Sequence, residues 1–188
     1  MLLRGLALAV FLGSAHADDV GRLRVLADEG DARAQYDLGL AYQQGTAVRR
    51  DLVEARRWWR KAADQGYGPA QFNMGILYAR GDGVSPDMRE ATQWFRRAAD
   101  QGHAPAQYYL GMSFAVGDAG PRNMDEALSW WRKAAMQGHS EAQHNLGLAY
   151  LRGDGVPKDR EESAKWLGMA AQQGYAPAAR LLKELDKL

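Results

Sequence analysis

The sequence predicts an all-α solenoid of stacked antiparallel helix pairs, and two observations lead to this prediction. First, residue types recur every 36 residues without insertion or loss, as in Ala34, Ala70, Ala106, Ala142 and Ala178. Second, each period contains two segments whose apolar residues follow helical spacing. A fixed period of this size is typical of solenoids, in which each repeat buries its apolar face against its neighbours.

The first helix of a repeat is expected over residues 34–44. Ala34, Leu38 and Tyr42 fall on one helical stripe, and Gly45 stands just past the end, where a left-handed residue is favoured. Gly39 lies inside this helix, where glycine costs about 1 kcal/mol relative to alanine. Because that cost returns at Gly75, Gly111 and Gly147, we predict that a neighbouring helix closely approaches the bare Cα at this position.

The second helix is expected over residues 52–65. A capping box precedes it, in which Asp51 accepts from the first turn and Glu54 reaches back to the cap. The equivalent caps are Asp87, Asn123 and Asp159. The tryptophans of this helix alternate with alanines at helical spacing, which is typical of a core rather than of a ligand platform.

The first residues of the chain have the layout of a secretory signal peptide. Arg4 precedes the apolar run 6–12, and Ala15-His16-Ala17 forms a small-residue cleavage site. The apolar run is shorter than the ~20 residues that span a bilayer. We therefore expect cleavage after Ala17 and a periplasmic or secreted protein, without stable membrane insertion.

The predicted organisation follows from the repeat and the signal. It comprises a signal peptide (1–17), an N-terminal half-repeat helix (18–30), repeats 1 to 4 (31–66, 67–102, 103–138 and 139–174) and a C-terminal capping helix (175–188). The chain has no cysteine, so neither disulfides nor a lipidated cysteine are expected. The net charge of +1 lacks the basic excess of a nucleic-acid-binding protein.

The repeat resembles the Sel1-like repeat, a relative of the tetratricopeptide repeat. Repeat 2 carries the pattern at Ala70, Met74, Gly75, Tyr78, Gly81, Gly83, Val84, Asp87, Ala91, Trp94, Ala98, Ala99 and Gly102. The resemblance implies an exported bacterial protein with a right-handed superhelix that acts as a scaffold for protein contacts. Its secreted bacterial relatives include regulators of envelope signalling, polysaccharide assembly factors and proteins that engage host molecules. Two loops depart from the pattern. Repeat 1 has Ala47 for a glycine, and the loop 117–123 of repeat 3 is expected to differ in shape.

A second stripe on the first helices is the candidate binding site. It holds Tyr36, Phe72, Tyr108, His144 and Arg180, and four residues further on Leu40, Ile76, Met112 and Leu148. We call these residues the aromatic stripe. By resemblance to tetratricopeptide arrays they point into a concave groove suited to a peptide or an amphipathic helix, with Arg80, Arg152 and Arg180 pairing with acidic groups of the partner. In the competing interpretation the rings pack between successive helices.

Residue types that carry catalysis do not gather in the sequence, so the predicted function is a non-enzymatic interaction scaffold with no cofactor and no metal. His103 and His139 share a position with Tyr67 and Tyr175, which favours a structural role over metal ligation. A monomer is favoured, and the partner is a protein or a peptide. Two alternatives stay open: a glycan-binding or polysaccharide-assembly factor, and an envelope hydrolase, which needs paired carboxylates or a metal set.

Overall fold

The structure, a computed structural model, describes residues 17–118 and 120–185. All ten elements in this part of the chain are α-helices, and they divide between two compact units, Met1–Asp87 and Met88–Leu188. None of these helices is both long enough and apolar enough to cross a membrane. The predicted signal peptide lies outside the described residues except for Ala17, with which the first helix begins.

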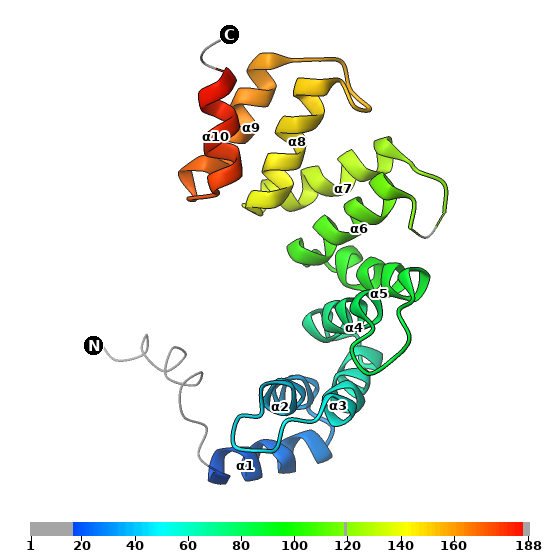
Figure 1. The fold of residues 1–188 in the computed structure, drawn as a ribbon. Coiled ribbons are helices and arrows are strands. Elements are labelled where there is room, and N and C mark those ends of the chain that lie inside the picture. Colours follow the sequence, from blue (N-terminus) through cyan, green and yellow to red (C-terminus); the bar gives the residue numbers. More distant parts are fainter. Residues whose placement is uncertain (1–16, 119, 186–188) are drawn as a thin grey trace, which may run out of the picture. The chain divides into compact units, whose positions relative to one another are not determined.

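The first unit contains four helices, each packed against its neighbour in the chain (Figure 1). They are α1 (Ala17–Asp28), α2 (Ala32–Gln44), α3 (Leu52–Asp64) and α4 (Gly68–Arg80). Val20, Ala27, Leu38 and Trp58 form one of its buried clusters. The predicted helix 34–44 thus begins two residues early as α2, and the predicted helix 52–65 ends one residue early as α3.

The second unit contains six helices, and these also pack pairwise in chain order (Figure 1). They are α5 (Met88–Asp100), α6 (Ala104–Val116), α7 (Met124–Met136), α8 (Ser140–Arg152), α9 (Arg160–Gln172) and α10 (Ala176–Leu185). Leu167, Ala178 and Leu185 form the cluster that buries α10 against α9. The chain is an all-α solenoid built from helix pairs, as the sequence predicts.

The close approach predicted at the glycine inside the first helix of a repeat is confirmed in repeats 1, 3 and 4. A Cβ added at Gly39 would lie 2.4 Å from Nε1 of Trp59, and one added at Gly111 would lie 2.5 Å from Cδ1 of Trp131. At Gly147 the Cγ of Leu167 would be 2.6 Å away. The missing side chain lets the second helix of the repeat approach the first.

The predicted tryptophan core is also confirmed. Every tryptophan is at most 8% exposed, and alanines fill the gaps between the rings. Basic side chains cover several indoles from outside: the Nζ of Lys61 lies 3.9 Å from the ring centroid of Trp58, and that of Lys133 lies 3.6 Å from Trp130. These tryptophans therefore contribute to stability rather than to an exposed ligand platform.

The capping box is only half right. Asp51 caps α3 as predicted, because its carboxylate accepts from the N–H of Val53 at 2.9 Å and of Glu54 at 3.1 Å. The prediction that Glu54 returns the bond to the cap is wrong. The N–H of Asp51 donates instead to the carbonyl of Tyr42 at 2.9 Å, and the Glu54 carboxylate accepts from Arg57 at 3.3 Å. The cap thus ties the second helix of the repeat to the last turn of the first.

Candidate functional site

The aromatic stripe lies on even-numbered helices, on α2 and α4 in the first unit and on α6, α8 and α10 in the second. Its rings Tyr36, Phe72, Tyr108 and His144 are all half-buried. The aliphatic residues Leu40, Ile76, Met112 and Leu148 are half-buried as well. The three arginines, Arg80, Arg152 and Arg180, are exposed. These burial levels lie between the open groove and the dry interface that the sequence left as alternatives.

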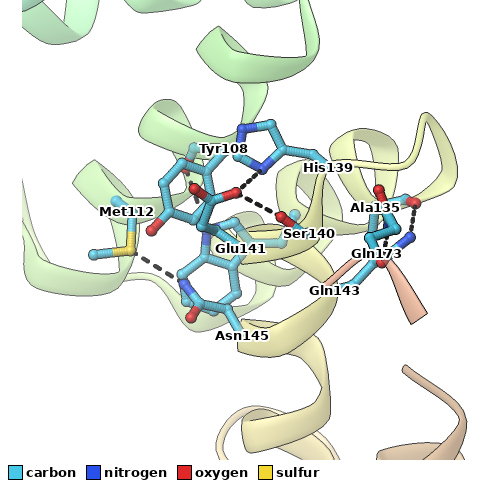
Figure 2. Close-up of polar contacts among 10 residues, drawn as sticks. Tyr108, Met112, Ala135, His139, Ser140, Glu141, Gln143, Asn145 and Gln173 are labelled. Atoms are coloured by element: carbon cyan, nitrogen blue, oxygen red, sulfur yellow. Dashed lines mark hydrogen bonds and ion pairs between the residues drawn. The ribbon is translucent and has the colours of Figure 1, made fainter. Parts of the chain in front are cut away.

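Tyr108 shows how a ring of the stripe is held (Figure 2). Its ring stacks on His139, with centroids 4.8 Å apart, and meets the edge of Tyr109 at 5.4 Å. Its backbone carbonyl accepts from Nε1 of Trp131 at 3.3 Å. Burial raises the pKa of its hydroxyl, and the charge of Glu141 raises that pKa further, whereas a hydrogen bond with Asn145 opposes both. Tyr108 is therefore a neutral, positioned ring.

The same contact recurs within each unit. The ring of Tyr36 lies 5.4 Å from that of Tyr67, and the ring of His144 lies 5.3 Å from that of Tyr175. In every case the partner ring precedes the next even-numbered helix. The sequence predicted a structural role for this repeat position, which holds tyrosine or histidine. The ring at this position supports a ring of the aromatic stripe.

The two supporting histidines have different surroundings. His103 caps α6, where its Nδ1 accepts from the N–H of Ala106 at 3.3 Å. The Nδ1 of His139 lies 3.4 Å from Oε2 of Glu141, which also accepts from the hydroxyl of Ser140 at 3.0 Å (Figure 2). Burial lowers the pKa of both imidazoles. Both rings are therefore neutral near pH 7; His103 acts as a helix cap, and His139 acts as the aromatic support of Tyr108.

The sequence reading missed a set of buried glutamines next to the stripe. Gln35, Gln71, Gln107 and Gln143 recur with the same period and are at most 5% exposed. The amide nitrogen of Gln143 donates to the carbonyl of Ala135 at 3.0 Å, and its oxygen accepts from Gln173 at 2.7 Å (Figure 2). Each such glutamine donates to a carbonyl at the end of the preceding helix, which also accepts from an N–H of the following turn. The recurrence of glutamine every 36 residues is the sequence feature that could have revealed this set.

Comparisons with known proteins agree with this architecture. The Sel1 repeat model matches residues 32–67, 68–103, 104–139 and 140–175. No curated protein sequence matches the chain. Among solved structures, a protective antigen of uropathogenic Escherichia coli with an SLR fold is 37% identical, with a TM-score of 0.85 over 87% of this chain. A Sel1 repeat protein from Oxalobacter formigenes is 38% identical, with a TM-score of 0.83 over 91% of this chain.

These relatives are longer proteins. The chain spans 35% of the E. coli antigen and 49% of the Oxalobacter protein. An immunity protein from Pseudomonas aeruginosa, Pa5087, has a TM-score of 0.56 at 22% identity over 87% of this chain and 60% of its own, a likeness of fold alone. With four matched repeats covering most of its residues, the chain belongs to the Sel1 repeat family, whose members are generally non-enzymatic scaffolds for protein interactions.

Proposed function

We propose that this protein is an exported bacterial scaffold, without enzymatic activity of its own, that holds a segment of a protein partner on the aromatic stripe. The observation that carries this proposal is the way in which the rings are held. Tyr108 and Tyr36 are half-buried, and each is fixed by a ring contact and a tryptophan bond to its backbone. A ring that is already immobilised loses little side-chain entropy when a partner covers it.

The exposed arginines define the expected partner chemistry. Arg80 and Arg152 end α4 and α8, and Arg180 lies on α10. A partner segment with apolar residues next to acidic ones would satisfy both the rings and these guanidinium groups. A glycan partner is the alternative outcome, and it would depend on the rings but not on the charges.

Export is part of the proposal and rests on residues 1–17. Arg4, the apolar run 6–12 and the Ala15-His16-Ala17 site together have the layout of a cleaved signal. The similar structures from E. coli and Oxalobacter are bacterial. Intact mass spectrometry of the protein recovered from the periplasm or the medium should give Asp18 as the first residue. Recovery of the full-length mass from the cytoplasm alone would contradict export.

The binding proposal is tested with two kinds of variant. Arg80→Glu/Arg152→Glu/Arg180→Glu reverses the exposed charges of the stripe and leaves its packing intact, whereas Tyr36→Gln/Tyr108→Gln removes two rings. A charge-matched control, Arg22→Glu/Arg49→Glu/Lys158→Glu, changes exposed residues elsewhere. Each protein is crosslinked in envelope extracts, and captured proteins are compared by mass spectrometry, with circular dichroism confirming that the fold is retained.

A partner captured by the wild type and the control, and lost by both stripe variants, would support the proposal. Equal capture of that partner by folded stripe variants would contradict it. Loss on ring removal alone, without any effect of charge reversal, would replace the acidic segment with an uncharged ligand such as a glycan.

A further inference from the structure

A cavity of about 570 Å³ lies in the second unit, away from the aromatic stripe. It is bounded by α5, the C-terminal half of α6 and the segment that leads to α7. Its lining residues are Arg89, Thr92, Gln93, Arg96, Ser113, Phe114, Gly120, Pro121, Arg122 and Asn123. Sites for small ligands or for single anchoring groups usually have volumes of about 300–1,000 Å³.

The cavity arises because two positions next to the loop of repeat 3 have smaller side chains than the equivalent positions 36 residues later, next to the loop of repeat 4. There, Val156 packs with Leu128 in a buried cluster. The residues 36 positions earlier are Gly120 and Thr92. A Cβ at Gly120 would meet nothing within 4 Å. The small residues at these two positions therefore leave the space open.

A third substitution changes the charge of the site. The hydroxyl of Tyr150 in repeat 4 accepts from Nη2 of Arg132 in repeat 3 at 2.8 Å. The equivalent pair 36 residues earlier is Phe114 and Arg96, and the guanidinium lies 5.3 Å from the centroid of the phenyl ring. Because Phe114 has no hydroxyl, it cannot accept a hydrogen bond from Arg96. The guanidinium of Arg96 therefore lies over an apolar ring, without the hydroxyl acceptor that Arg132 has in Tyr150.

Two further arginines complete the rim. Arg122 is fixed by a bond from its Nε to the carbonyl of Ala115 at 3.1 Å, which leaves its terminal nitrogens as donors. Arg89 lines the cavity from α5. The ten lining residues include three arginines and no aspartate or glutamate, so the lining itself carries positive charge. The walls between the arginines include Phe114, Pro121 and the buried Thr92 and Ser113.

We propose that this cavity is a second binding site, which takes a carboxylate carried next to an apolar side chain on an acidic segment of a polypeptide partner. The guanidinium forks of Arg96 and Arg122 match the geometry of a carboxylate, and Phe114 and Pro121 accommodate the apolar neighbour. The choice of a polypeptide over a free anion rests on the proposed scaffold function. The cavity and its charge do not depend on that function.

The first test variant fills the cavity with apolar side chains that should also stabilise the fold. Thr92→Leu/Gly120→Val introduces the residues found 36 positions later, Leu128 and Val156, and a Cβ at Gly120 would meet nothing within 4 Å. This variant is expected to melt at a higher temperature than the wild type. Arg96→Gln/Arg122→Gln removes two charges, and Arg132→Gln is the matched control from the position 36 residues after Arg96, where Val156 and Leu128 fill the space.

The binding experiment follows backbone amide shifts by NMR in the full mature chain. The probes are a short acetylated peptide alternating leucine and glutamate, the same peptide with glutamine, and citrate and inorganic phosphate as free anions. We expect the glutamate peptide to shift the amides of Thr92, Gly120 and Arg122. These shifts should vanish in the filled variant, weaken about tenfold in the double arginine variant and persist in Arg132→Gln.

Three outcomes would overturn the inference. These are no shifts at the cavity amides, shifts that persist in the filled variant, or equal shifts with the glutamine peptide. Comparable shifts with citrate or phosphate would overturn the polypeptide source and make the cavity a site for free anions. Shifts at Tyr108 and His144 report the aromatic stripe separately, so failure of the cavity is distinguishable from failure of the proposed function.

Discussion

The pair α2–α3 and the pair α8–α9 achieve the same close packing with different side chains. In the first pair the Cα of Gly39 faces the indole of Trp59, whose Nε1 donates to the carbonyl of Tyr36 at 3.2 Å. In the second pair Gly147 faces Leu167, and the donor is the hydroxyl of Ser163, 2.7 Å from the carbonyl of Gly147.

The difference between these pairs shows what the repeat requires. Both keep a bare Cα on the even-numbered helix and one side-chain donor that reaches across to its backbone. The donor changes from an indole to a hydroxyl, and its position moves by four residues, from that of Trp59 to that of Ser163. The repeat therefore constrains backbone distance more tightly than side-chain identity.

The largest predicted effect tests that backbone constraint. Gly39→Ala should destabilise the protein by about 3 kcal/mol, because its Cβ meets the rigid indole of Trp59. Gly147→Ala should cost about 1 kcal/mol, since Leu167 can change rotamer. The control is Gly168→Ala on α9, where a Cβ meets nothing within 4 Å and alanine should gain about 1 kcal/mol. Urea unfolding followed by circular dichroism measures all three, and stabilisation by Gly39→Ala would refute the steric argument.

A second prediction concerns the buried glutamine that both helix pairs have at the same repeat position. Gln35→Leu and Gln143→Leu should each destabilise the protein by about 1 kcal/mol, because each removes a side-chain hydrogen bond to a buried helix-end carbonyl, which then accepts only from an N–H of the following turn. Gln173→Ala should have a smaller effect, since Gln173 is exposed and the bond from Gln143 to Ala135 remains. Thermal melts compare the three variants. An effect of Gln173→Ala as large as that of Gln143→Leu would show that the pair, rather than the carbonyl bond, carries the stability.

These glutamines also mark a limit of prediction from sequence. Apolar spacing predicted the helices and the repeat positions of the core, since burial of apolar groups follows directly from residue type. Gln143 is polar, and its partners Ala135 and Gln173 lie 8 and 30 residues away, so only the three-dimensional packing shows why it is buried. The reciprocal bond expected from Glu54 failed for a related reason, since the carbonyl of Tyr42 takes the N–H of Asp51.

The candidate sites were predictable to different degrees. Helical spacing placed Tyr36 and Tyr108 on even-numbered helices, but not the supporting rings Tyr67 and His139, because each pair is separated by an intervening helix. For the loop 117–123 the sequence predicted a different shape. It did not predict the cavity, which depends on the simultaneous loss of bulk at Thr92 and Gly120 on two separate segments.

The third prediction compares the loops of the same two repeats. Ala47 adopts a left-handed φ of 57°, a conformation that is unfavourable for alanine, whereas repeat 4 has Gly155 at φ 73°. Ala47→Gly should therefore stabilise the protein by about 1 kcal/mol. Gly155→Ala should destabilise it by at least as much, because its Cβ would also lie 2.8 Å from Cβ of Met124. Differential scanning calorimetry measures both shifts, and a lower melting temperature for Ala47→Gly would contradict the backbone argument.

The smallest predicted effect is that a fall in pH lowers the stability of the second unit more than that of the first. The supporting ring of Tyr36 is Tyr67, whereas in the second unit that of Tyr108 is His139, and His144 belongs to the stripe itself. Burial lowers the pKa of both histidines below the ordinary value of 6.5; Arg152 lowers that of His144 further, and Glu141 opposes the shift at His139. A lowered pKa means that the unfolded chain takes up protons first as the pH falls. The stability of the second unit should therefore be greatest above pH 6.5 and fall as the pH drops below that value.

Hydrogen exchange resolved by helix gives the measurement. On moving from neutral pH to about pH 5, the protection of α8, expressed as an opening free energy to remove the intrinsic pH dependence of exchange, should decrease more than that of α2. The change should be modest, because both histidines are only half-buried and solvent screens their charges. His139→Tyr introduces the residue found at position 67 and should weaken the pH dependence of α8 while leaving the stack on Tyr108 in place. An unchanged pH dependence in that variant would exclude His139 as the source of the effect and leave it as a ring that supports the stripe at any pH.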